Sequence, residues 1–216
     1  SSRAASMAEL PTGESSISRC GFVALIGAPN VGKSTLINAL VGSKVAIVSH
    51  KVQTTRAVLR AIAIVGGSQL VLIDTPGIFA PKRRLDRAMV TNAWAGAHDA
   101  DIAAVLIDAT RGLDEEATAI LERLADAKQP RILLLNKVDL VEKSALLAVA
   151  SAANARAAFA ATFMISALTG DGVADVKHWL AAHVPEGPWH YPEDQLTDAP
   201  LRQLAAEITR EKLYLR

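Results

Sequence analysis

Residues Gly27 to Ser34, with the sequence Gly-Ala-Pro-Asn-Val-Gly-Lys-Ser, have the types and spacing of a phosphate-binding loop. The two glycines let the backbone turn tightly, so that successive N–H groups point inward at a polyphosphate. Lys33 supplies a cation for the β- and γ-phosphates, and the Ser34 hydroxyl is a ligand for a bridging Mg²⁺ ion. We assign nucleotide contacts here to Gly27, Asn30, Val31, Gly32, Lys33, Ser34 and Thr35.

Two further segments carry side chains that suit the metal ion and the γ-phosphate. The stretch from Gly42 to Arg56 lacks a clear period and contains Thr54 and Thr55, either of which can complete the Mg²⁺ shell; we place the ligand at Thr55. In the later segment Asp-Thr-Pro-Gly, a carboxylate can hold the metal and a glycine N–H can approach the γ-phosphate. We therefore predict metal ligands at Ser34, Thr55 and Asp74, nucleotide contacts at Thr54, Asp74, Thr75 and Gly77, and catalytic roles for Lys33, Thr55 and Gly77.

A third segment, Asn-Lys-x-Asp, has the groups that distinguish guanine from adenine. The Asp139 carboxylate can accept two hydrogen bonds from N1–H and the exocyclic amine of guanine, and adenine would leave that carboxylate unpaired. Asn136 would contact the other edge of the base and tie this loop to the phosphate-binding loop, while the stem of Lys137 can lie on a base face. Farther along, the Ala167 N–H could donate to guanine O6. We assign nucleotide contacts to Asn136, Lys137, Asp139, Ser166, Ala167 and Leu168.

Short apolar runs alternate with helical stretches and place these segments. The runs predict strands at 22–26, 57–65, 69–73, 101–108, 131–135 and 162–165. Helices are expected after Gly32, over 86–98, from Asp114 to before Pro130, over 143–160 and from Val173 to Val184. This alternation predicts an α/β fold with a mostly parallel sheet and helices on both faces. In such a sheet the ligand lies at the carboxyl ends of the strands, where each motif falls.

Composition and charge limit the protein classes that remain. The chain has 216 residues, 50% hydrophobic and 4% aromatic, which predicts one well-buried domain with an aliphatic core. A net charge of +1 gives no overall attraction to nucleic acid or membrane. Cys20 is the only cysteine, which excludes an internal disulfide. No apolar run approaches the roughly 20 residues of a membrane span, so we expect a cytoplasmic protein, with peripheral contact at the inner membrane as the open alternative.

Taken in order, the five motifs resemble those of the translation-factor-related, Ras-like P-loop GTPases. Cys20-Gly21-Phe22, Gln53 to Arg56 and Asp74 to Ile78 are similar to the bacterial Era/TrmE-like family within that class. The resemblance implies a six-stranded sheet with one antiparallel strand, Mg²⁺-dependent binding of GTP or GDP, and hydrolysis of GTP to GDP and phosphate. Ile78 stands where Ras-like enzymes orient water with a glutamine, so we expect slow intrinsic hydrolysis. An asparagine placed like Asn30 helps to hold K⁺ in related GTPases, which leaves activation by K⁺ open.

The ends of the chain differ in composition from its middle. Residues 1–18 are small and polar and predict a disordered leader, and 19–185 are assigned to the GTPase domain. Residues 186–198, rich in proline and polar groups, predict a linker. Residues 199–216 resemble the first helix of the family's KH-type RNA-binding domain, which the chain truncates. The resemblance implies a monomer that binds 16S rRNA and assists assembly of the small ribosomal subunit.

Three other interpretations stay open. One is a GTPase of tRNA modification or membrane association, and another is a P-loop phosphotransferase that acts on a small metabolite. The third is a module that binds nucleotide without catalysis. The guanine-specific pattern from Asn136 to Asp139 favours a GTPase over a phosphotransferase.

Overall fold

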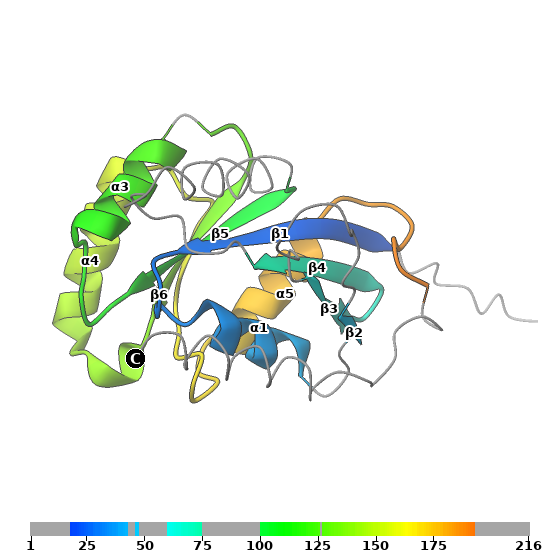
Figure 1. Cartoon of the computed structure of the whole chain (residues 1–216), viewed down its shortest axis with the longest axis horizontal. Helices are drawn as coiled ribbons and strands as arrows, with labels where there is room; N and C mark the ends of the chain where they lie inside the picture. The colour runs from blue at the N-terminus through cyan, green and yellow to red at the C-terminus, as the bar shows by residue number, and fades with distance from the viewer. Residues whose placement is uncertain (1–17, 43–45, 48–59, 75–99, 126, 193–216) are drawn as a thin grey trace, which may run out of the picture.

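A mixed sheet runs through the part of the chain that the computed structural model describes, which is residues 18–42, 46–47, 60–74, 100–125 and 127–192. Its strand order is β2-β3-β4-β1-β5-β6-β7 (Figure 1). The strands are β1 (Arg19–Gly27), β2 (Ala46–Ile47), β3 (Arg60–Val65), β4 (Ser68–Asp74), β5 (Ile102–Asp108), β6 (Arg131–Asn136) and β7 (Ala161–Met164). β3 is antiparallel to β2 and β4, and β4, β1, β5, β6 and β7 pair in parallel. The expected mostly parallel sheet with one antiparallel strand is confirmed.

The two-residue strand β2 extends the expected six strands to seven. It lies in the stretch from Gly42 to Arg56, in which the sequence shows no clear period. Two residues are too few to show the period of two by which a strand is recognised. The pairing of β2 with Ala61 and Ile62 of β3 therefore becomes visible only in the folded chain.

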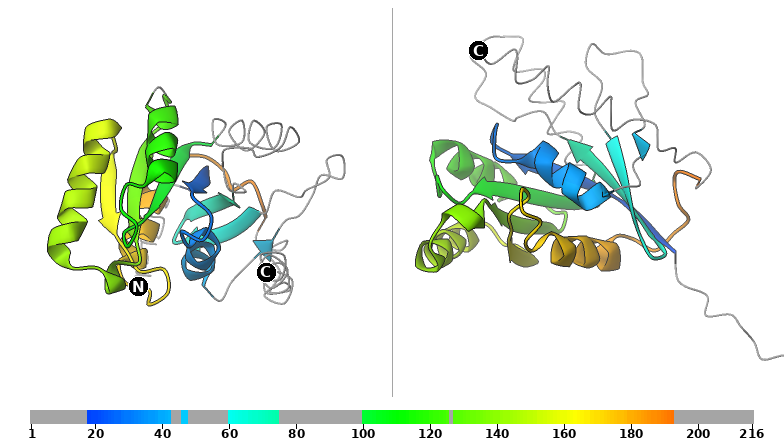
Figure 2. Two further views of the ribbon diagram at one scale, coloured as in Figure 1. Left: turned by 60° about the vertical axis from the view of Figure 1, so that its left-hand side comes forward. Right: turned by 90° about the horizontal axis from the view of Figure 1, so that it is seen from below.

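Helices cover both faces of the sheet, as predicted. α1 (Lys33–Val41) and α5 (Val173–His183) pack on one face, and α3 (Glu115–Leu124) and α4 (Lys143–Arg156) pack on the other (Figure 2). The alternation of side chains along β1 explains the two layers, since Val23 and Leu25 join the core under α1 and α5. Ala24 and Ile26 join the core under α3 and α4.

The ends of the helices follow local chemistry. Asp114, the predicted start of α3, caps the helix by accepting a hydrogen bond from the Ala117 N–H at 2.8 Å. α4 ends at Arg156, four residues before the predicted end, because Ala157 is extended and the Ala160 N–H already donates to Arg131 O at the entry to β7. The helix predicted over 86–98 lies outside the described residues.

The carboxyl ends of the parallel strands lie at one edge of the sheet and bring the predicted loops together. Leu25, two residues before the end of β1, is opposite Asp74 of β4. At the other side of β1, the last residues of β5 and β6, Asp108 and Asn136, are opposite each other. Loops that are far apart in the sequence are therefore neighbours here.

Residues 186–192, which we call the strap, lie against the opposite end of the sheet. Glu186 forms a bridge and an ion pair of 2.8 Å with Arg19 at the start of β1. The Trp189 indole Nε1–H donates to Gly67 O at 2.9 Å. The buried Gln69 side chain donates to Tyr191 O at 2.8 Å and accepts from Tyr191 N at 3.1 Å. The strap is the described part of the segment 186–198 that the sequence predicted to be a linker.

Candidate nucleotide-binding site

The phosphate-binding loop joins β1 to α1 as the sequence predicts. Gly32 precedes α1 with a φ of 102°, and an added Cβ would overlap the side-chain amide of Asn136, so the position requires glycine on two grounds. Lys33, the first residue of α1, donates from Nζ to the carbonyl oxygens of Gly27 and Ala28 at 3.0 Å each. These bonds hold the lysine ammonium group along the inside of the loop.

Asn136 connects three loops with one side chain. Its Nδ2 donates to Val31 O of the phosphate-binding loop at 2.8 Å, and its Oδ1 accepts from the Ala167 N–H at 2.9 Å. The side chain is 2% exposed, so both hydrogen bonds are shielded from water. The tie to the phosphate-binding loop that we expected of Asn136 is present, and its contact with a base stays a prediction.

Lys137 forms a second connection between the same loops. Its backbone is left-handed, with a φ of 67°, and its Nζ donates to Asn30 O at 3.0 Å and to Asp108 Oδ2 at 2.5 Å. Burial acts to raise the pKa of the Asp108 carboxyl, but hydrogen bonds from Lys137 and Thr110 outweigh it, and the pKa lies below its ordinary value. Asp108 is therefore an anionic anchor for Lys137 at neutral pH.

The remaining base-recognition residues lie at the ends of β6 and β7. Asp139 is exposed in a short 3₁₀ helix, η1 (Val138–Leu140), which leaves its carboxylate accessible. Ser166 is fully buried, and Leu168 is 82% exposed. The Ala167 N–H that we assigned to guanine O6 donates to Asn136 Oδ1 in this structure, so the predicted contact needs that hydrogen to be shared between two acceptors.

Two of the predicted metal ligands are described. Ser34 lies in the first turn of α1, and Asp74 is the last residue of β4. A hydroxyl and a carboxylate are hard oxygen ligands of the kind that Mg²⁺ prefers, and the ion commonly takes its other ligands from phosphates and water. Among the described residues, no group of three or more His, Cys, Asp or Glu side chains could hold a metal ion by itself. Thr54, Thr55, Thr75, Gly77 and Ile78 lie outside the described residues.

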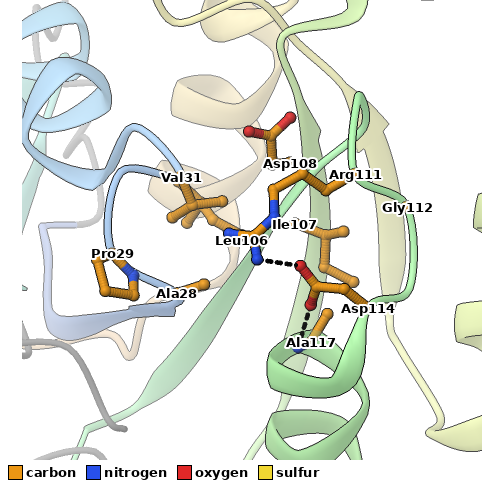
Figure 3. Close-up of a pocket in the computed structure, with 10 residues that line it drawn as sticks. All are labelled: Ala28, Pro29, Val31, Leu106, Ile107, Asp108, Arg111, Gly112, Asp114 and Ala117. Atoms are coloured by element: carbon orange, nitrogen blue, oxygen red, sulfur yellow. Dashed lines mark hydrogen bonds and ion pairs between the residues drawn. The ribbon is translucent and has the colours of Figure 1, made fainter.

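A small pocket beside the phosphate-binding loop contains charged residues that the sequence did not single out (Figure 3). Arg111 points into it between β5 and the loop, and its guanidinium pairs with Asp114 at 2.8 Å and Glu116 at 3.5 Å. Asp108, at the end of β5, is part of the same lining. The sequence could have indicated Asp108 as a site residue, because Asp108 follows an apolar run just as Asp74 and Asn136 do. The lining consists of Ala28, Pro29, Val31, Leu106, Ile107, Asp108, Arg111, Gly112, Asp114 and Ala117.

Comparison with known proteins assigns this fold and site to a class. A family model described as 50S ribosome-binding GTPase matches residues 22–137, more than half of the chain. The matched part contains the phosphate-binding loop and the segment from Asn136 into Lys137. The fold, the arrangement of the loops and this match define the chain as a P-loop GTPase.

The curated relatives narrow the class to one family. The chain is 67% identical over 207 residues to GTPase Era of Bradyrhizobium sp. (strain BTAi1 / ATCC BAA-1182), covering 96% of this chain and 67% of the relative. It is 62% identical over 210 residues to GTPase Era of Mesorhizobium japonicum, covering 97% and 68%. The chain belongs to the Era family of bacterial GTPases.

Solved structures of Era share the fold. A variant of Aquifex aeolicus Era bound to GDP.AlF4- is 37% identical, with a TM-score of 0.73 over 90% of this chain and 66% of that one. Era in complex with MgGDPNP and nucleotides 1506-1542 of 16S ribosomal RNA is 36% identical, with a TM-score of 0.74 over 90% and 67%. The chain thus spans about two thirds of the length of its relatives. Among the described residues no helix is long and apolar enough to cross a membrane.

Proposed function

We propose that this chain binds Mg²⁺ with GTP or GDP at the carboxyl edge of its sheet and works as a GTP-hydrolysing switch. The observation that carries the proposal is the pair of bonds made by Asn136 to Val31 O and Ala167 N. One buried side chain sets the distance between the loop suited to phosphates and the two loops suited to a guanine base. That arrangement fits a single guanine nucleotide lying across all three loops.

Lys33 binds the β- and γ-phosphates in this proposal. An ammonium group has three donors, so Nζ can exchange its carbonyl acceptors, Gly27 O and Ala28 O, for phosphate oxygens without moving to another part of the loop. The N–H groups of the loop and the N-terminus of α1 add partial positive charge. Ser34, Asp74 and Thr55, with Thr54 as the alternative, are the proposed metal ligands. When bound, Mg²⁺ would neutralise negative charge on the phosphates.

Hydrolysis is proposed to be slow in the isolated chain. Ile78 has no hydrogen-bonding group where a glutamine orients the water in Ras-like enzymes, so backbone groups near Thr55 and Gly77 are left to position it. A K⁺ ion held near Asn30 would supply additional positive charge. Equal turnover in potassium and sodium buffers would exclude this role for K⁺.

The proposed role of the whole protein extends beyond this chain. One Era structure contains 16S ribosomal RNA, and the match to one curated relative covers 67% of that relative's length. We propose that the longer, cytoplasmic protein binds 16S rRNA through a KH domain that begins within residues 199–216. In it the nucleotide state would control assembly of the small ribosomal subunit. Peripheral membrane contact and a monomeric state belong to the same proposal.

Nucleotide binding and phosphate release test both levels. In this chain we expect steady release of phosphate from GTP, and we expect this release to disappear in Lys33→Ala. The free energy of unfolding in urea, measured without nucleotide, should be the same in both proteins. Persistence of the release in that variant would contradict the role of Lys33. In the full-length protein, addition of small ribosomal subunits should change the rate of release. An unchanged rate would count against the ribosomal role.

A further inference from the structure

Asp108 lies outside every motif from which the nucleotide site was predicted. We propose that Asp108 is a positioning residue for nucleotide binding, because its carboxylate holds Lys137 and, through Lys137, holds the phosphate-binding loop at Asn30. This inference rests on the proposed contact between Lys137 and a guanine nucleotide. It adds a residue of β5 to a site otherwise built from β1, β4, β6 and the loop after β7.

The two oxygens of the Asp108 carboxylate have separate partners. Oδ1 accepts from the Thr110 N–H at 2.9 Å and from the Thr110 hydroxyl at 2.6 Å. Oδ2 accepts from Lys137 Nζ at 2.5 Å. Thr110 therefore fixes the orientation of the carboxylate, and the second oxygen is directed at the lysine. The Asp108 side chain is only 10% exposed and that of Lys137 33%, so water screens this ion pair less than it screens a surface pair.

The bond from Lys137 to Asn30 joins two unusual backbone positions. Of the non-glycine residues within the described ranges, only Asn30 and Lys137 have a positive φ, at 59° and 67°. Left-handed backbone is unfavourable for residues with a Cβ and persists where surrounding contacts hold it. Here the ammonium group of Lys137 donates hydrogen bonds both to the Asn30 carbonyl and to the Asp108 carboxylate. Asp108 therefore keeps Lys137 in place directly, and keeps the backbone of Asn30 in place through Lys137.

The position of Asn30 in the loop explains why this matters for the nucleotide. Asn30 and Val31 are adjacent residues in the loop whose N–H groups face the phosphates. Val31 O is held by Asn136, and Asn30 O is held by Lys137. Loss of the Asp108 anchor removes the support of one of these two cross-links. We therefore expect the nucleotide to leave faster while the specificity for guanine, which resides in Asp139, is unchanged.

The substitution Asp108→Asn tests this with little change in shape. It removes the negative charge and places an NH₂ group on one side of the former carboxylate, so Lys137 loses its charged acceptor. In this chain we expect a fluorescent GDP analogue to dissociate about tenfold faster, which corresponds to about 1.4 kcal/mol. Asp101→Asn is the matched control, because Asp101 lies just before the other end of β5 and accepts from the Phe22 N–H at 2.7 Å. Its dissociation rate should match that of the wild type.

A double-mutant cycle separates positioning from a general structural role. If Asp108 acts through Lys137, Asp108→Asn should accelerate release in the wild type and have little further effect in a Lys137→Met background. Asp108→Glu, which keeps a carboxylate, should restore part of the slow release. Additive effects of Asp108→Asn and Lys137→Met, or a wild-type rate in Asp108→Asn, would overturn the inference. A wild-type chain that does not retain the GDP analogue would instead contradict the proposed nucleotide site itself.

Discussion

At the scale of single residues, the site depends on side chains that can donate and accept at the same time. Asn136 donates to Val31 O and accepts from the Ala167 N–H, which requires a side-chain amide; glutamine also has one, but its side chain is one methylene longer. Aspartate would lack the donor and leucine would lack both groups. This explains why an asparagine, rather than any buried residue, stands at the end of β6.

We expect Asp139 to determine which base the site prefers. Replacing Asp139 with asparagine exchanges one acceptor for a donor, so the guanine N1–H and exocyclic amine lose their shared partner. We expect the affinity for GDP to fall by about 10²-fold or more and the affinity for xanthosine diphosphate to rise. Calorimetric titration of both nucleotides measures this, with Asp175→Asn on the exposed side of α5 as the control. Unchanged GDP affinity would refute the role of Asp139.

The lowered pKa of Asp108 predicts how stability depends on pH. A carboxyl whose pKa is lower in the folded chain than its ordinary value of 3.8 stabilises the fold above that value, and the contribution is lost as the pH falls through the folded value. We expect wild type to exceed Asp108→Asn by about 1 to 2 kcal/mol in free energy of unfolding at pH 7. The difference should close below pH 3.8 in urea titrations. A difference that is constant with pH would contradict the charged contact.

At the scale of elements, long periodic segments were predictable and short or context-dependent features were not. The strands that carry the motifs and the cap of α3 at Asp114 follow from local sequence, because burial on alternating faces and capping are local signals. β2 and the early end of α4 depend on pairing partners elsewhere in the chain. Asp108 was missed for the same reason, since its importance comes from Lys137, 29 residues away.

We expect the strap to shield the thiol of Cys20 from solvent. Cys20 is buried next to the strap, and its thiol donates to Oε1 of Gln69, the side chain that also binds Tyr191 of the strap, at 3.4 Å. Burial raises the pKa of the thiol, and this outweighs a lowering hydrogen bond with the backbone of His190 in the strap. Trp189→Phe removes the indole hydrogen bond to Gly67 O. We expect the single thiol to react about fivefold faster with a disulfide reagent in this variant, because the strap opens more often.

A matched variant controls for the loss of an indole. Trp179→Phe changes a tryptophan of α5 whose ring packs against Phe163 and His183. Its thiol should react at the wild-type rate, and GDP affinity should be unchanged in both variants. Equal acceleration in the two variants would mean that global loosening, rather than opening of the strap, exposes Cys20.

At the scale of the whole molecule, the two ends of the sheet have different tasks. The loops suited to the nucleotide lie at the carboxyl ends of the parallel strands, and the strap lies at the opposite end, where β1 and β4 begin. β1 and β4 therefore connect the strap to the phosphate-binding loop and to Asp74. The net charge of +1 over the 216 residues gives no broad attraction to RNA.

We propose that the loops joined by Asn136 and Lys137 form one site for a guanine nucleotide. The most direct measurement is a pair of calorimetric titrations of this chain, with GDP and with ADP, in the presence of Mg²⁺. We expect saturable binding of one GDP per chain and an affinity for ADP lower by a factor on the order of 10⁴. Binding of ADP with an affinity similar to that of GDP would contradict it.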